Sequence, residues 1–124
     1  MAEQKQSNYG TDIMNKEILD DNSIEKAVDY LRDSAEPSAQ ATANRKYLEE
    51  YRKAKKSLLM KKHLTLAISA QEREAYADPE YVELILGLKQ AIYEDEKQKH
   101  LRVAAEAKIE AWRTKQANLR AIKL

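Results

Sequence analysis

The feature that most constrains the fold is the scarcity of helix-breaking residues in the C-terminal part of the chain. After Pro79 there is no further proline and a single glycine, Gly87. Because proline and glycine disfavour helix most strongly, the segment from Glu80 to about Ile122 is predicted to form one uninterrupted helix. About 43 residues at 1.5 Å each span roughly 65 Å, which is longer than a compact domain of this size. Gly87 costs an isolated helix about 1 kcal/mol relative to alanine, and close approach of another helix is the expected reason for it.

Composition narrows the fold class to all-α. The whole chain contains two glycines, two prolines and no phenylalanine, so it has little material for the tight turns and strands of a sheet. It has no cysteine, which excludes a disulfide framework, a zinc finger and thiol catalysis. We therefore expect a helical hairpin with a very long C-terminal helix, a short N-terminal helix and a coiled-coil-like oligomer.

Capping signals and apolar spacing divide the chain further. Residues 1–21 are polar without sustained periodicity, and are predicted to form a flexible acidic arm. A helical domain is expected over residues 22–124, with helices at about 22–34, 37–67, 71–76 and 79–122. The predicted helix starts are Asn22 and Ser69, each with a glutamate three residues later, Pro37 at a first helical position, and Asp78 as the N-cap of the long helix.

Charged residues alternate in sign along the chain in blocks. Residues 37–70 hold eight bases and two acids, and residues 71–96 hold eight acids and two bases. Antiparallel packing of helix 37–67 on the long helix brings these blocks together, so the predicted hairpin is electrostatically self-consistent. Residues 97–124 again hold eight bases and two acids, and this block has no comparable acidic partner within the hairpin.

Basic residues interleaved with tyrosines in helix 37–67 predict nucleic-acid binding. Lysine and arginine neutralise phosphates, and a flat aromatic ring lets a base stack on it without reading sequence, which suits single strands. An alternative is that the tyrosines lie on the core stripe and the bases only keep the helix soluble. The candidate residues are Arg45, Lys46, Tyr47, Tyr51, Arg52, Lys53, Lys55, Lys56, Lys61 and Lys62.

The alanine-rich end of the long helix predicts a contact between copies of the chain. Its apolar stripe has too little chain of its own to cover it, and small side chains beside the stripe permit close helix contact. Trp112 belongs either to this interface, to the core or to a stacking site. The predicted oligomer interface consists of Leu101, Ala105, Ile109 and Trp112.

No enzymatic, cofactor or metal site is expected. The chain lacks the phosphate-binding, dinucleotide-binding, nucleophile-elbow and zinc-protease motifs, and His63 and His100 have no partners at ligand spacing. Glu94, Asp95 and Glu96 are consecutive, so on a helix they point about 100° apart and cannot converge on one ion. No apolar run approaches the ~18 to 20 residues of a membrane span, and the N-terminal sequence has no secretory or transit signal. We therefore expect a cytoplasmic protein without membrane contact.

Three segments carry a family resemblance: Ala77-Asp-Pro-Glu-Tyr-Val-Glu-Leu-Ile-Leu-Gly-Leu-Lys-Gln-Ala91, Ala104-Ala-Glu-Ala-Lys-Ile-Glu-Ala-Trp-Arg-Thr114 and Ala117-Asn-Leu-Arg-Ala121. Over roughly residues 44–122 the chain resembles small early proteins of tailed bacteriophages that are carried near single-strand annealing recombinases. Its helical layout is also similar to that of UvsY-type recombination mediators, which are small ring-forming proteins that load a recombinase on single-stranded DNA. The resemblance implies a location in the bacterial host cytoplasm and a phage or host recombinase as partner.

Two functions follow as hypotheses. The first is a phage recombination mediator or accessory protein that binds single-stranded DNA non-specifically and assists a recombinase. The second is a protein-interaction adaptor or inhibitor, such as a host-takeover or anti-defence factor, without nucleic-acid binding. Neither hypothesis requires catalysis.

The uncovered apolar stripe generates the first testable prediction, which is that the chain is a homo-oligomer. Multi-angle light scattering at micromolar concentration is expected to give a mass that is a multiple of the chain's 14.3 kDa. A single species at the mass of one chain would end this hypothesis.

Overall fold

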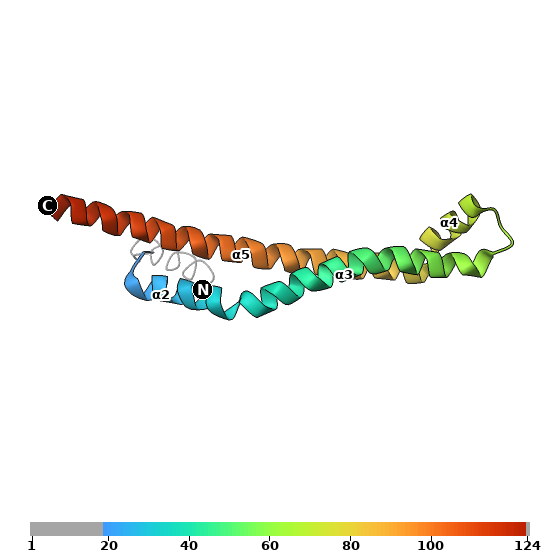
Figure 1. Ribbon diagram of the computed structural model, residues 1–124, viewed down its shortest axis with the longest axis horizontal. Helices are drawn as coiled ribbons and strands as arrows, with labels where there is room; N and C mark the ends of the chain where they lie inside the picture. The colour runs from blue at the N-terminus through green and yellow to red at the C-terminus, as the bar shows by residue number, and fades with distance from the viewer. Residues whose placement is uncertain (1–18, 124) are drawn as a thin grey trace, which may run out of the picture. The chain divides into compact units, whose positions relative to one another are not determined.

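A computed structural model describes residues 19–123, and these residues form four α-helices without any strand (Figure 1). The all-α prediction, including the very long C-terminal helix, is confirmed. The coiled-coil-like oligomer stays a prediction, and most of the predicted arm 1–21 lies outside the described residues. The elements are α2 (Asp21–Asp33), α3 (Ala35–Met60), the single 3₁₀ turn η1 (Lys61–His63), α4 (Ile68–Ala77) and α5 (Pro79–Lys123).

The start of α5 is as expected, whereas the start of α2 is not. The carboxylate of Asp78 accepts a hydrogen bond from the backbone N–H of Glu80 at 2.9 Å, so Asp78 caps the helix that Pro79 begins. At α2 the carboxylate of Asp20 accepts from the backbone N–H of Ser23 at 2.6 Å. Asp20 therefore supplies the cap that the capping-box pattern assigned to Asn22.

The helix predicted over residues 37–67 begins earlier and ends earlier. It starts at Ala35, and Pro37 falls in its first turn, where the missing N–H would have no helical partner in any case. It ends at Met60, and η1 leads the chain into an extended Ala67 that begins α4. The Ser69 capping box is therefore not the start of α4. The turn that brings α4 back onto α3 interrupts the apolar spacing that had suggested a longer helix.

Contacts group the described residues into two units. The hairpin unit consists of residues 33–103, and the terminal unit consists of residues 19–32 together with residues 104–123. Because α5 runs from Pro79 to Lys123, it contributes to both units.

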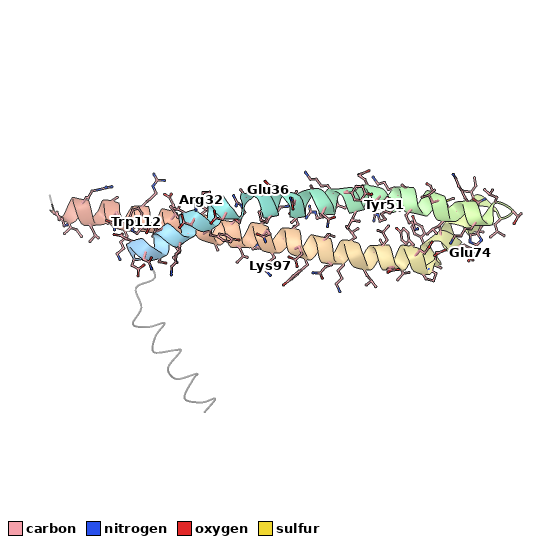
Figure 2. The ribbon with its side chains drawn as sticks, turned by 90° about the horizontal axis from the view of Figure 1, so that it is seen from below. Arg32, Glu36, Tyr51, Glu74, Lys97 and Trp112 are labelled. Carbon is pink, nitrogen blue, oxygen red and sulfur yellow. The ribbon has the colours of Figure 1, made fainter. Side chains whose placement is uncertain are left out.

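In the hairpin unit, α3 and the first part of α5 run antiparallel, with α4 packed at their turn (Figures 1 and 2). The core at this end consists of Leu59, Ala75 and Tyr81, with Met60 and Ile85 packed against it. A ring contact extends this core, because Tyr76 meets Tyr81 edge to face at a centroid distance of 5.3 Å. Leu88 and Ala91 continue the buried face of α5 toward the middle of the hairpin.

Gly87 does not have the role expected of it within the described chain. A Cβ atom built at Gly87 would meet nothing within 4 Å. Close approach of another helix of the described chain is therefore not the reason for this glycine. It lies instead on a shallow groove with Tyr51, Lys55 and Leu84.

In the terminal unit, α2 lies beside the C-terminal part of α5 (Figures 1 and 2). Ile24 and Ala27 are buried on the inner face of α2. Trp112 is half-buried on α5. Helix α2 and the C-terminal part of α5 therefore bury apolar side chains within one unit.

The small core of the hairpin unit generates a stability prediction. Leu59 is 2% exposed, so Leu59→Ala leaves a cavity and is expected to lower the free energy of unfolding by about 2–5 kcal/mol. The matched control is Leu64→Ala, at a leucine that is 73% exposed, with an expected change below about 0.5 kcal/mol. Urea unfolding followed by far-ultraviolet circular dichroism measures both, and equal losses would contradict this description of the core.

Candidate nucleic-acid interface

The residues predicted to bind nucleic acid all lie on α3 and η1, but the fold divides their charges into two groups. The first group contacts carboxylates of α4, α5 and the residue between them. Its closest pairs are Arg45 with Asp95 at 3.0 Å, Lys62 with Asp78 at 3.3 Å, Lys56 with Glu72 at 3.4 Å and Lys55 with Glu80 at 3.5 Å. The predicted pairing of the basic block with the acidic block is confirmed. These bases are largely neutralised by their own chain.

The second group remains available to a ligand, and we call it the solvent-facing bases: Lys46, Arg52, Lys53 and Lys61. Within residues 19–123, Lys46, Arg52 and Lys61 form no ion pair. Lys53 meets only Glu50, at 3.5 Å, and both side chains are well exposed. A surface pair of this kind contributes about 0.2–1 kcal/mol, so a phosphate can displace it.

The two tyrosines of the site lie against each other. The rings of Tyr47 and Tyr51 are 5.8 Å apart between centroids and inclined by only 9°. Tyr47 is 62% exposed, so it is not part of the core of the hairpin unit. Tyr51 is half-buried and lines the shallow groove that contains Leu84 and Gly87. The fold thus presents one tyrosine ring to solvent and supports it with the other.

The middle of the hairpin is polar, and its centre is Asp95. This residue is fully buried, although it lies in the wholly polar stretch of residues 94–100. One carboxylate oxygen accepts a hydrogen bond from the hydroxyl of Thr42. The other lies 3.0 Å from a guanidinium nitrogen of Arg45 and 3.1 Å from the ammonium of Lys99. A buried charge needs such partners, because burial without them costs several kcal/mol.

A second polar contact lies further along the same interface. The buried hydroxyl of Ser34 accepts a hydrogen bond of 2.7 Å from the guanidinium of Arg102. Small side chains at this end of α3 leave room for the long side chains of α5. Sequence reasoning missed Ser34, Thr42 and Asp95 as a set, although the spacing of eight residues between Ser34 and Thr42 places both on one face of α3.

The ion pairs hold their groups in the charged form. The hydrogen bond from the Glu80 backbone and the neighbouring Lys62 lower the pKa of Asp78, and the hydrogen bond to Asp78 raises the pKa of Lys62. At Asp95, the hydrogen bond from Thr42 and then the cations Lys99 and Arg45 lower the pKa of the carboxyl. Asp78, Lys62 and Asp95 are therefore charged at neutral pH.

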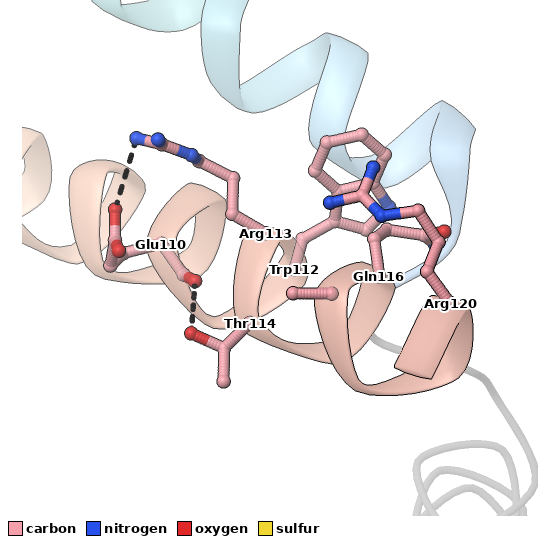
Figure 3. A pocket seen from close by; sticks show the side chains of 7 residues that line it. Glu110, Trp112, Arg113, Thr114, Gln116 and Arg120 are labelled. Atoms are coloured by element: carbon pink, nitrogen blue, oxygen red, sulfur yellow. Dashed lines mark hydrogen bonds and ion pairs between the residues drawn. The ribbon is translucent and has the colours of Figure 1, made fainter. Parts of the chain in front are cut away.

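The predicted oligomer interface is divided between the two units. Leu101 belongs to the hairpin unit and is 46% exposed. Ala105, Ile109 and Trp112 are half-buried in the terminal unit, which also contains α2. Figure 3 shows Trp112 near Gln116 and Arg120, with Glu110 and Arg113 paired at 3.4 Å on another part of the helix. Part of the surface assigned to a second copy is thus covered within the chain, and the homo-oligomer stays a prediction.

No match was found when the chain was compared with known protein families, curated proteins and solved structures. The resemblance to phage early proteins therefore remains a hypothesis. None of the helices within residues 19–123 combines the length and apolar character needed to cross a membrane. The same residues contain no group of three or more histidine and acidic side chains placed to hold a metal ion.

The buried carboxylate generates a prediction about pH. Because the folded-state pKa of Asp95 is lowered, its contribution to stability is complete above the unfolded-state pKa of about 3.9 and is lost as the pH falls through the folded-state value. Asp95→Asn is expected to lower the free energy of unfolding at neutral pH by about 1–3 kcal/mol, because two cations lose a buried partner. The difference from wild type is expected to shrink below about pH 4.

The control is Glu96→Gln, which removes a half-buried carboxylate that contacts the same Arg45 at 3.0 Å. Because this pair remains in contact with water, it is worth at most about 1 kcal/mol. Urea unfolding at several pH values measures both variants. A loss for Asp95→Asn that does not change with pH would contradict the electrostatic explanation.

Proposed function

We propose that this protein is a non-catalytic accessory protein that binds single-stranded DNA without sequence preference. The observation that carries the proposal is the division of the basic block, in which the solvent-facing bases stay exposed on α3 and η1 while the remaining bases pair with acids. Phosphate binding needs cations that have no internal partner, because each phosphate contact gains its free energy from released counterions. Lys46, Arg52 and Lys61 meet that requirement, and Lys53 is held only by its surface pair with Glu50.

The arrangement along α3 suits a strand that follows the helix. Lys46 and Lys53 are seven residues apart, which is close to two helical turns, so they lie nearly in line. Arg52 and Lys61 lie off this line and add exposed positive charge on α3 and η1. Two acids lie between Lys46 and Lys53, and both are already paired: Glu49 contacts Arg45 at 3.3 Å, and Glu50 contacts Lys53 at 3.5 Å. A small number of phosphate contacts predicts weak binding that depends on salt.

Assistance to a recombinase enters the proposal through the resemblance to phage early proteins. It fits a protein that holds DNA by backbone and stacking contacts, because such binding leaves the base sequence unread for the recombinase. The phage origin and the recombinase partner are therefore proposed together with DNA binding, and both fall if DNA binding fails.

A protein partner is the second candidate, and one observation favours it. Leu64 and Ile68, at the turn between η1 and α4, are 73% and 70% exposed, and Leu66 between them is 42% exposed. Three aliphatic side chains in one exposed turn form the kind of apolar patch that proteins use for contacts. In this reading the solvent-facing bases only keep α3 soluble.

A titration of fluorescent oligo-dT by anisotropy tests the proposed site. The double variant Lys46→Ala, Lys53→Ala is expected to bind about tenfold or more weakly, and its log–log salt dependence is expected to fall by roughly 0.7 per lost phosphate contact. The matched control is Lys89→Ala, Lys97→Ala, which removes the same charge from exposed positions of α5. Circular dichroism checks that each variant is folded.

Wild-type protein that fails to bind oligo-dT at low salt would overturn the proposal and leave the protein-partner candidate. Equal losses in both double variants would mean that α3 is not the site. Lys55 and Lys56 are unsuitable for this test, because they pair with Glu80 and Glu72, so their replacement would also change contacts that hold the hairpin together.

A further inference from the structure

The tyrosine pair of α3 deepens the proposed function, on which this inference rests. We infer that a nucleobase stacks on the ring of Tyr47, so that the ligand is an unpaired strand. Tyr47 is 62% exposed, and it lies next in sequence to the solvent-facing base Lys46. Consecutive side chains on a helix point about 100° apart, so Lys46 lies to one side of the ring, where its long side chain can hold the phosphate of a strand whose base covers Tyr47.

Tyr51 acts as a positioning residue for the ring of Tyr47 on which the base stacks. Its ring lies nearly parallel to that of Tyr47, with centroids 5.8 Å apart, and it is itself half-buried beside Leu84 and Gly87. A ring that is already held by a neighbour loses less rotamer freedom when a ligand covers it. The exposed face of Tyr47 is therefore organised before a strand arrives.

The other exposed tyrosines of the described chain already have a cation near the ring. The ammonium of Lys97 lies 6.0 Å from the ring centre of Tyr93, and that of Lys56 lies 4.7 Å from the ring centre of Tyr76. Among residues 19–123, Tyr47 is the well-exposed tyrosine whose ring faces no cation. Stacking a base there displaces no existing contact, which distinguishes Tyr47 from Tyr93.

The same geometry distinguishes a single strand from a duplex. In a duplex each base is stacked between its neighbours, so it has no free face for a side chain on the outside of the helix. The solvent-facing bases can still contact duplex phosphates, but Tyr47 adds nothing to that contact. Selectivity for unpaired DNA is therefore assigned to the ring of Tyr47, and general affinity for DNA to the lysine and arginine side chains.

The experiment compares three ligands of equal length: oligo-dT, the same sugar–phosphate chain without bases, and a duplex. Wild-type protein is expected to bind oligo-dT roughly tenfold more tightly than the abasic strand, because one stacked base contributes a factor of this order. Tyr47→Leu keeps an apolar side chain but removes the ring, and is expected to lower oligo-dT affinity to the abasic level. Its affinity for the abasic strand and for the duplex is expected to stay unchanged.

Two further variants complete the comparison. Tyr47→Phe keeps the ring and is expected to retain most of the affinity for oligo-dT. Tyr93→Leu removes a tyrosine that is 57% exposed on α5, and is expected to bind all three ligands as wild type does. Since both tyrosines are exposed, circular dichroism and urea unfolding are expected to change little.

The outcomes separate this inference from the proposed function. Equal wild-type affinity for oligo-dT and the abasic strand, or unchanged oligo-dT binding by Tyr47→Leu, overturns stacking on Tyr47 but leaves phosphate binding by α3 in place. Failure of wild-type protein to bind any of the three ligands at low salt overturns both.

Discussion

The buried carboxylate of Asp95 is the contact on which the arrangement of the hairpin depends. It receives a hydroxyl from Thr42 and two cations from Arg45 and Lys99. A shift of α3 by one residue would put Ala41 or Ala43 opposite this carboxylate, and neither has a polar side chain. The cost of an unpaired buried charge therefore disfavours other registers, in the way that buried polar groups specify register in coiled coils. Apolar packing at Leu59 and Tyr81 stabilises the hairpin without selecting its register so sharply.

The register decides which bases a ligand can use. With Asp95 opposite Thr42, the antiparallel arrangement brings Lys55 to Glu80 and Lys62 to Asp78. These lysines stabilise the hairpin and lose most of their attraction for a phosphate. The solvent-facing bases and the ring of Tyr47 stay exposed. The chain thus uses one basic block for two purposes, and the pairing with acids separates them.

The apolar core of the hairpin is small, which explains why ion pairs make up so many of the contacts between its helices. Leu59, Ala75 and Tyr81 form the buried cluster at the turn, while Leu64 and Ile68 remain exposed just beyond it. A two-helix hairpin encloses little volume, so each apolar side chain on its edge stays in contact with water. The exposed turn and the exposed face of α3 are consequences of the same thin architecture. The exposed turn and the exposed face of α3 are both accessible to a binding partner.

The sequence by itself determined the helical fold, the start of the long helix at Asp78 and Pro79, and the pairing of oppositely charged blocks. These features follow from helix propensity, from capping residues and from the distribution of charge along the chain, all of which can be read from the amino-acid sequence. Tertiary structure alone decided that α3 ends at Met60, that Asp95 is buried, and that Tyr47 faces solvent while Tyr51 is held beneath it. Each of these depends on the rotation and register of one helix against another. An amphipathic pattern with charges on several faces is compatible with more than one such rotation, and the polar partners of the buried Asp95 select among them.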